Sequence, residues 1–431
     1  MRRHEKIKPP VKRFRSTIER IGAKGEGVAL DPEGGVVYVP YTAPGDVVDI
    51  EARGDRGHVI ETFDASELRR AAPCMHFGQC GGCSLQHLDL DYYYEWKGQE
   101  VGYALHAALG DRISRVSVAP VVRVPAATRR RASLYVDRSE TRPKIGFHKR
   151  RTRDIVNIET CLILHPKLAN YLPSLRQIIE LLPRTWRRFR ANVTLCDNGF
   201  DLDLQPSEHC EVLSHEALQS LAESFRASKT LRLSVDGDLM LAQETPVISF
   251  GGVRAQPVSG GFLQASSEAE RIIRKEIIGA VSGAKHIADL FSGAGAFSLP
   301  LAKTARVSAF DSDARSISAL KTAASAHAAE LKPLNAQVRN LYERPLTAEE
   351  LNAFDAVVMD PPRAGAPAQA KALSKGGPKT IVYVSCNPKT FARDARYLID
   401  AGYALTFVTP IDQFVYSSHT ELIGVFVWGR R

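Results

Sequence analysis

A cysteine and an aspartate follow two apolar runs that have the composition of buried strands. Cys386 lies in Ser385-Cys386-Asn387-Pro388, and Asp360 begins Asp360-Pro361-Pro362-Arg363, 26 residues earlier. A thiolate can add to an electron-poor carbon and leave again later. The C5 carbon of a pyrimidine attacks a methyl group only after a nucleophile has added at C6, so Cys386 predicts carbon methylation through a covalent adduct. The plain alternative is that this cysteine is a small buried hydrophobe.

The residue after the two prolines separates two kinds of methyl acceptor. An aromatic ring there would favour methylation of an amino group by stacking on the base, but this chain has Arg363. A carbon acceptor also needs a base that removes the C5 proton after methyl transfer. Glu421, or the neighbouring His419, stands at the start of the last apolar run and could act as this base.

A glycine-rich turn indicates where a methyl donor would bind. The run 286–291 leads into Ser292-Gly293-Ala294-Gly295, where the backbone can approach a ligand closely. Asp311 ends the next apolar run, and a carboxylate at that place can accept both hydroxyls of a ribose. The dinucleotide fingerprint is not met, because Ser298 stands at the third glycine position. The pattern instead resembles the S-adenosylmethionine site of class I methyltransferases.

Three further cysteines have the spacing of a metal or cluster site. Cys74, Cys80 and Cys83 form a C-x5-C-x2-C motif with glycines beside them, and Cys161 supplies a distal fourth thiol. Four thiolates can hold either zinc or an iron-sulfur cluster, and the spacing alone does not separate the two. Disulfides are the weaker alternative, since an odd total of seven cysteines and no export signal favour a reducing, cytoplasmic location.

The elements that must position these groups change in character along the chain. Residues 9–66 show short strands separated by turns, as in a small β-barrel, and their order resembles the TRAM domain of RNA-modifying enzymes. Residues 91–110 have a helical pattern, and residues 115–250 alternate strands with basic loops. From residue 256 onward, apolar runs at 286–291, 306–310, 354–359 and 380–385 alternate with helices, which predicts a mostly parallel sheet.

The net charge of +9 is unevenly distributed over the 431 residues. Residues 1–190 contain 33 Lys and Arg against 22 Asp and Glu, whereas residues 191–431 contain 24 against 26. A positive charge confined to one half suggests that a polyanion, most naturally a nucleic acid, is held there. The loops 128–131 and 144–153 are strongly basic, although such loops are often only solvated. No run of eighteen apolar residues is present, so no membrane span is expected.

Taken in order, these motifs resemble the RNA uracil C5-methyltransferase family, and specifically its iron-sulfur members that act on ribosomal RNA. The resemblance implies a multidomain α/β fold. Its parts would be an OB-like TRAM β-barrel over 9–66, a central α+β RNA-binding domain with the cluster over 67–255, and a Rossmann-like class I methyltransferase domain over 256–431. The helix 91–110 could pack on the catalytic domain.

The resemblance also implies roles for single residues. Cys386 would be the nucleophile and Glu421 the base for the C5 proton. A [4Fe-4S] cluster would be held by Cys74, Cys80, Cys83 and Cys161. The donor site would be formed by Gln264, Phe291, Asp311, Asn340 near the adenine, and Asp360 near both uracil and donor.

Two positions depart from the family pattern. Ala296 stands where asparagine is common, and Asp311 stands where glutamate is common. We therefore expect a weakened contact to the amino acid part of the donor, while the nucleophile is unaffected.

The expected function is transfer of a methyl group from S-adenosylmethionine to C5 of a uridine in 23S ribosomal RNA. The alternatives are the same reaction on transfer RNA, or a non-catalytic RNA-binding or ribosome assembly factor. We expect a cytoplasmic monomer that binds ribosomal RNA, with no membrane association and no obligate protein partner. Cys196 and Cys210 are left without a predicted role.

Overall fold

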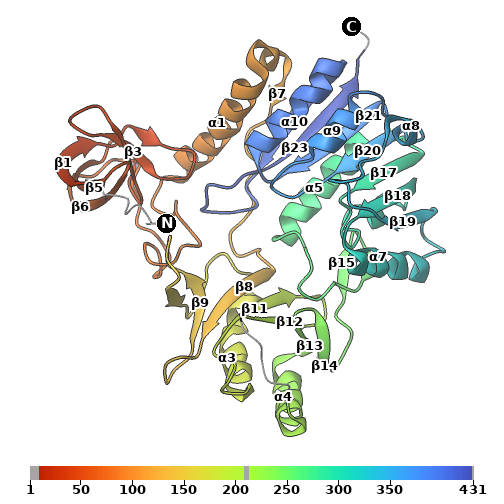
Figure 1. Ribbon diagram of the computed structural model, residues 1–431, viewed down its shortest axis with the longest axis horizontal. Coiled ribbons are helices and arrows are strands. Elements are labelled where there is room, and N and C mark those ends of the chain that lie inside the picture. Colours follow the sequence, from red (N-terminus) through yellow and green to blue (C-terminus); the bar gives the residue numbers. More distant parts are fainter. Residues whose placement is uncertain (1–8, 208–212, 430–431) are drawn as a thin grey trace, which may run out of the picture. The chain divides into compact units, whose positions relative to one another are not determined.

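The computed structural model describes residues 9–207 and 213–429 of the chain (Figure 1). Its backbone divides into two compact units. Of the described residues, the first unit contains 9–100 with the short segments 148–152 and 416–418, and the second contains 101–147, 153–207, 213–415 and 419–429. No helix in the described part of the chain is long and apolar enough to cross a bilayer.

The first unit contains a six-stranded sheet in the order β1-β5-β6-β4-β3-β2. Its strands confirm the short strands expected between residues 9 and 66: β1 (Val11–Thr17), β2 (Arg20–Ile21), β3 (Gly27–Leu30), β4 (Val36–Val39), β5 (Val47–Arg53) and β6 (Arg56–Asp64). In β5 every second side chain is buried, among them Val48, Ile50 and Ala52, and these pack against Val37 and Val39 of β4. Alternation with period two thus separates the small core from the charged outer residues.

The second unit begins within helix α1 (Leu90–Leu109), which confirms the predicted helix. Its residues Val101, Leu105 and Leu109 pack into the core of the large sheet described below. After the short 3-10 helix η1 (Gly110–Arg115), strand β7 (Ser117–Val118) joins the edge of that sheet beside β22. The predicted central domain of residues 67–255 includes this segment, which instead lies in the sheet of the predicted catalytic domain.

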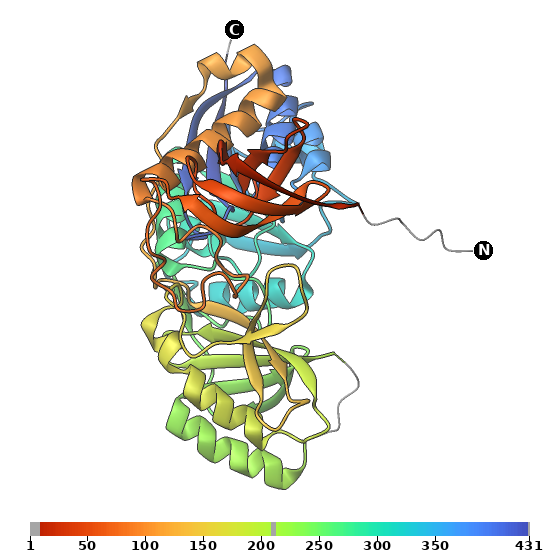
Figure 2. The same ribbon diagram turned by 90° about the vertical axis from the view of Figure 1, so that its left-hand side faces the viewer.

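A seven-stranded sheet follows, in the order β10-β9-β8-β11-β12-β13-β14. Helices α3 and α4 pack side by side against it (Figure 2). The strands are β8 (Arg131–Asp137), β9 (Lys144–His148), β10 (Ile155–Asn157), β11 (Arg188–Leu195), β12 (Phe200–Pro206), β13 (Thr230–Val235) and β14 (Asp238–Ala242). The helices are α2 (Pro166–Asn170), α3 (Leu172–Leu181) and α4 (His215–Ser228). A hairpin of β15 (Ile248–Phe250) and β16 (Val253–Ala255) leads onward.

The last part of the second unit is an eight-stranded sheet in the order β19-β18-β17-β20-β21-β23-β22-β7. Strands β17 (His286–Leu290), β18 (Arg306–Asp311), β20 (Ala356–Met359) and β21 (Thr380–Ser385) confirm the four apolar runs predicted as strands. They are parallel to one another and to β19 (Leu334–Val338). Strand β23 (Glu421–Trp428) is antiparallel to both β21 and β22 (Tyr403–Ile411).

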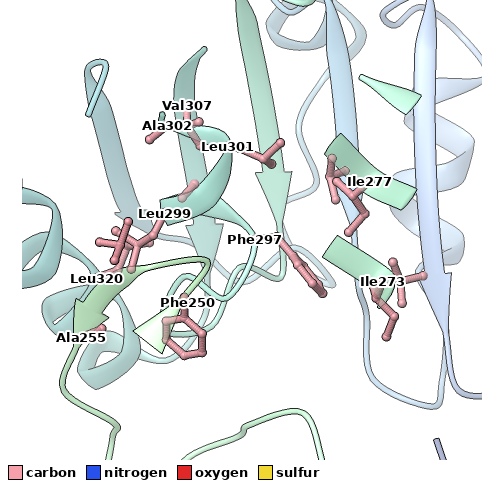
Figure 3. Close-up of a cluster of buried hydrophobic side chains, with 14 of the residues drawn as sticks. Phe250, Ala255, Ile273, Ile277, Phe297, Leu299, Leu301, Ala302, Val307 and Leu320 are labelled. Atoms are coloured by element: carbon pink, nitrogen blue, oxygen red, sulfur yellow. The ribbon is translucent and has the colours of Figure 1, made fainter. Parts of the chain in front are cut away.

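Alternate residues of these strands enter two different hydrophobic clusters, as expected for a sheet buried on both faces. In β20, Val358 belongs to the cluster that includes helix α5, and Val357 to the cluster that includes α10. Figure 3 shows part of the first cluster, with side chains from α5, α6, α7, β18 and the hairpin β15–β16. The helices are α5 (Ser267–Ala280), α6 (Ser298–Leu301), α7 (Ala314–Ala326), α8 (Ala348–Leu351), α9 (Pro367–Leu373) and α10 (Pro388–Ala401).

Candidate active site

Strand order in the eight-stranded sheet gathers the chemically active residues at one edge. Phe291, Asp360 and Cys386 each follow directly on the last residue of β17, β20 and β21, and these strands are adjacent and parallel. The carboxyl ends of parallel strands meet at the same edge of a sheet. Glu421 reaches this edge from the opposite direction, because β23 is antiparallel and its Leu422 pairs with Ser385.

These residues line a cavity of about 520 Å³, which is within the usual size range of small-molecule sites. The cavity is contained within the second unit. Of the seven residues predicted for catalysis or donor binding, six line it: Gln264, Phe291, Asp311, Asp360, Cys386 and Glu421. The structure thus brings together the nucleophile, the base and most of the donor residues expected from sequence.

Asn340 is the predicted residue that does not line the cavity. Its side-chain Oδ1 instead accepts a hydrogen bond from the backbone N of Tyr342, at 3.1 Å. Tyr342 itself lines the cavity, and its ring centroid lies 5.6 Å from that of Phe291. Tyr342 therefore lines the cavity beside Phe291, and the expected place of Asn340 near the adenine stays a prediction.

The glycine-rich turn after β17 has the backbone conformation that a close approach to a ligand requires. Phe291, Gly293 and Gly295 have φ angles of 62°, 52° and 96°, in the left-handed region. The backbone N of Gly293 donates to Asp311 Oδ2 at 2.8 Å, and the backbone N of Asp313 donates to Asp311 Oδ1 at 2.8 Å. These bonds fix the Asp311 carboxylate at the cavity wall, as a ribose acceptor requires.

Four polar side chains form a continuous hydrogen-bond network in the cavity wall. Gln264 Nε2 donates to Asp360 Oδ2 at 2.8 Å. Gln413 Nε2 donates to Gln264 Oε1 at 3.0 Å and to Glu421 Oε2 at 2.9 Å. Gln413, which lies in the loop between β22 and β23, is not among the residues predicted from the sequence. Its only signal was its position eight residues before the predicted base.

The carboxyl groups of this network have raised pKa values. Burial and the charge of Asp289 raise the pKa of Asp360 to about 7, and the hydrogen bond from Gln264 opposes this shift. Burial and the charge of Asp360 raise the pKa of Glu421 well above its usual range, and the bond from Gln413 lowers it. A carboxyl group with a raised pKa is suited to take up a proton near neutral pH.

The Cys386 thiol lies in a less favourable environment for ionisation. Burial, followed by the negative charges of Glu421 and Asp360, raises the pKa of Cys386 to about 11. The positive charge of Arg363 acts in the opposite direction. The carbonyl oxygen of Arg363 accepts from Asn387 Nδ2 at 3.2 Å, so the Asp-Pro-Pro-Arg loop is tied to the cysteine loop.

His419, the alternative base, takes a different position. Its Nδ1 accepts a hydrogen bond from Arg363 Nη2 at 3.1 Å, and its side chain is exposed. Glu421 is 2% exposed and lines the cavity, whereas His419 does not. The geometry therefore favours Glu421 as the base.

The predicted basic loop 128–131 contributes to this site in a way that the sequence did not show. Arg129 and Arg131 line the cavity. Arg130, between them, is buried in an ion pair with Glu270, and its Nε donates to the backbone O of Gln264 at 3.2 Å. The loop thus supplies two positively charged side chains to the cavity, and its third arginine holds the backbone at Gln264 in place.

The four cysteines of the predicted cluster site are each half-buried. Cys74, Cys80 and Cys83 belong to the first unit, and Cys161 to the second. The backbone N of Gly82 donates to Cys80 Sγ at 3.4 Å, and burial, together with the charge of Cys74, raises the pKa of Cys80. Within residues 9–207 and 213–429, no group of three or more His, Cys, Asp or Glu side chains is assembled to hold a metal ion. The structure does not show the expected cluster site.

The two remaining cysteines have no predicted role. Cys196 is buried, and burial raises its pKa. Cys210 lies outside the described residues.

Comparison with known proteins places this site in a family. Residues 255–430 match the family described as tRNA (Uracil-5-)-methyltransferase. A Mesorhizobium japonicum protein named as an uncharacterized RNA methyltransferase is 38% identical over 97% of this chain and 98% of its own length. A Caulobacter vibrioides protein of the same description is 38% identical over 95% of this chain and 99% of its own length.

Two further proteins carry more specific names. A Vibrio parahaemolyticus protein named 23S rRNA (uracil(1939)-C(5))-methyltransferase RlmD is 30% identical over 95% of this chain and 94% of its own length. The crystal structure of Pyrococcus abyssi tRNA (uracil-54, C5)-methyltransferase with S-adenosyl-L-homocysteine has a TM-score of 0.73 and 24% identity. It covers 96% of this chain and 99% of that chain, and it shows that the two share a fold.

Proposed function

The chain belongs to the RNA uracil-C5-methyltransferase family, and from this premise we propose that it methylates C5 of a uridine in 23S ribosomal RNA through a covalent Cys386 adduct. The observation that carries the proposal is the meeting of Cys386, Asp360 and Glu421 in one cavity of about 520 Å³. A thiol for C6 and a carboxylate for the C5 proton are the two groups that this reaction requires.

The cavity residues fit the methyl donor. Asp311, held by two backbone amides, can accept the ribose hydroxyls. Phe291 and Tyr342 place two aromatic rings at the wall, where an adenine can be packed. S-adenosylmethionine, when bound, supplies an electrophilic methyl group.

The reaction then follows from the side chains of this chain. The Cys386 thiolate forms a bond to C6 of the uracil, and the electron pair of the C5–C6 double bond moves toward O4. The enolate carbon C5 attacks the methyl carbon, whose bond to the donor sulfur breaks. Glu421 takes the proton from C5, the C5–C6 double bond forms again, and the bond between Cys386 and C6 breaks.

The proton that leaves the Cys386 thiol has a candidate acceptor on the cavity wall. The pKa of Cys386 is raised to about 11, so its proton must be removed before or during attack. Asp360, with a pKa raised to about 7, is within electrostatic reach of the thiol and can hold a proton there at neutral pH.

Two variants test the covalent scheme. Cys386→Ala should abolish methylation of uridine-containing RNA, measured by transfer of a labelled methyl group. Glu421→Gln should still form and methylate the adduct but release it slowly, so a nuclease-sensitive band of reduced mobility should appear in a denaturing gel. Retained activity of Cys386→Ala would overturn the scheme, and no such band with Glu421→Gln would remove the role of Glu421.

The choice of 23S ribosomal RNA rests on less specific support. The Vibrio parahaemolyticus relative is named for that substrate, and the first 190 residues carry the excess of positive charge. The six-stranded sheet of residues 11–64 is a candidate TRAM-type RNA platform. Mapping 5-methyluridine in ribosomal and transfer RNA from a deletion strain tests the substrate. Loss confined to transfer RNA would favour the alternative substrate, and no loss would favour a binding factor.

We also propose that Cys74, Cys80, Cys83 and Cys161 hold a [4Fe-4S] cluster, as the family resemblance implies. Its support is the half-buried position of all four cysteines and the N–H···S bond at Cys80. No step of the reaction uses the cluster, so its role would be structural. Anaerobic purification with iron, sulfide and zinc analysis tests this, and a colourless zinc protein would refute the cluster.

A further inference from the structure

Gln413 is a buried amide that the reaction scheme does not yet use. It lies in the loop between β22 and β23 and is 6% exposed. The backbone of this loop is held in place, since Asp412 N donates to Val122 O at 3.0 Å and Gln413 N donates to Ile411 O at 3.0 Å. The Gln413 side chain therefore projects from a fixed backbone into the cavity wall.

The hydrogen-bond network determines the orientation of both of its amides. When both carboxyl groups are ionised they only accept hydrogen bonds, and the amide nitrogens face Asp360 at one end and Glu421 at the other. Gln264 meets this condition with Nε2 toward Asp360, which leaves its Oε1 to accept from Gln413. Gln413 Nε2 thus donates one hydrogen to Gln264 Oε1 and the other to Glu421 Oε2.

Glu421 depends on this contact. Among the described residues, Gln413 is the one hydrogen-bond donor to its carboxylate. Burial and the charge of Asp360 raise the pKa of Glu421, and the bond from Gln413 lowers it. Without that bond, less of the Glu421 carboxyl would be ionised at neutral pH, and its orientation would be set by packing alone.

The second polar atom of Gln413, the buried Oε1, makes no hydrogen bond within the described part of the chain. Buried amides that only stabilise a fold usually satisfy both ends, because an unmet group costs free energy. One unmet end in a cavity wall is typical of a functional position.

We propose that Gln413 is the positioning residue for the base: it holds the Glu421 carboxylate in the orientation that takes the C5 proton and links it to Gln264 and Asp360. This inference rests on the proposed function, since it assigns Glu421 the C5 proton. Gln413 acts through Glu421 and need not touch the reacting atoms.

The test compares Gln413→Met with the unaltered protein in single-turnover reactions on uridine-containing RNA. Methionine has a similar length and keeps the packing but donates no hydrogen bond. We expect formation of the adduct to change little and its release to slow by about 10- to 100-fold at neutral pH, the range for a lost hydrogen bond to a charged group. The covalent band should accumulate, as with Glu421→Gln.

The pH dependence of adduct release distinguishes this role from a merely structural one, which would leave that dependence unchanged. Because loss of the donor raises the pKa of Glu421 further, the rising limb of the release rate should shift to higher pH in Gln413→Met. The defect should therefore be smaller at pH 9 than at pH 7. Gln413→Glu has the same shape but places a second carboxyl group beside Glu421, so its release should be slower still at neutral pH.

Thr409→Val is the matched control, because Thr409 is a buried residue of β22 outside the cavity wall. It should leave the release rate and its pH profile unchanged. Donor affinity, measured by calorimetry, should differ less than about twofold among the folded variants.

If Gln413→Met does not fold, Gln413→Asn, whose shorter amide does not reach Glu421, gives the same comparison. An unshifted profile with unchanged release in an active enzyme refutes the role of Gln413. An inactive unaltered protein, or an active Cys386→Ala, refutes the proposed function instead.

Discussion

At the scale of single residues, the site combines a thiol and two carboxyl groups whose pKa values are all raised. These groups are Cys386, Asp360 and Glu421. Burial contributes most to each raised pKa, and mutual repulsion of the charges adds to it. Arg363 is the cation that opposes this trend at Cys386. Its charge is therefore expected to help the thiolate form, beyond its role in the loop after β20.

We predict that Arg363→Gln slows adduct formation by roughly tenfold near pH 7.5. Removing the positive charge raises the pKa of Cys386 further, and each unit of pKa reduces the thiolate fraction tenfold. The thiolate is gained as pH rises, so the rate should increase toward pH 9 in both proteins. The measurement is single-turnover adduct formation across this pH range.

Arg396→Gln is the control for this prediction, because Arg396 is an exposed arginine of α10 that pairs with Asp400. It should leave adduct formation unchanged. An Arg363→Gln protein that forms the adduct at the normal rate and with the normal pH dependence would contradict the assigned electrostatic role.

At the scale of elements, the turn between β17 and α6 depends on backbone conformations that favour glycine. Gly295 has a φ of 96°, and a Cβ atom placed there would lie 2.4 Å from Leu320 Cδ1 of α7. A side chain at this position must displace the buried Leu320 side chain or distort the turn. The turn carries Gly293, whose backbone N holds Asp311, so its shape is coupled to the donor site.

We predict that Gly295→Ala lowers the free energy of unfolding by about 1–3 kcal/mol and weakens donor binding. The cost combines a left-handed backbone with a clash against Leu320. Urea unfolding and calorimetric titration with S-adenosylhomocysteine provide the measurements.

Gly279→Ala offers a matched comparison on helix α5, where an added Cβ would meet nothing within 4 Å. Alanine forms helix more readily than glycine, so this variant should be neutral or more stable by about 0.5–1 kcal/mol. Equal losses in the two variants would show that Gly295 has no special conformational demand.

At the scale of the whole molecule, charge is divided between the parts of the chain. The first 190 residues have an excess of eleven positive charges and the rest an excess of two negative charges. Lys149 and Arg153 are exposed in the basic loop after β9. Such residues add affinity for phosphates without reading sequence, and their contribution falls with added salt.

We predict that Lys149→Gln combined with Arg153→Gln weakens RNA binding and flattens its salt dependence. If each side chain neutralises one phosphate, the slope of log K against log salt should fall by about 1.4 in magnitude on single-stranded RNA. Binding titrations at several salt concentrations measure this.

Lys321→Gln combined with Lys375→Gln removes the same charge from exposed positions of the last 241 residues. This control should leave the slope nearly unchanged. Equal effects of the two double variants would show that RNA affinity follows total charge rather than its distribution.

Much of the fold and of the chemistry was readable from local patterns. The strand ends before Asp360 and Cys386, the glycine-rich turn and the basic first half were all predicted, because apolar periodicity and turn residues act over short distances. The proposed nucleophile and base likewise follow from residue type and from position beside a strand.

Only the tertiary structure decided which of these residues meet. Glu421 faces the cavity because β23 inserts antiparallel between β21 and β22, a pairing that no local pattern specifies. Gln413 and Arg131 join the wall from distant segments, and Tyr342 lines it beside Phe291. Sequence alone determined the chemistry available to this protein, whereas long-range strand order and burial determined which groups share one cavity and how readily each ionises.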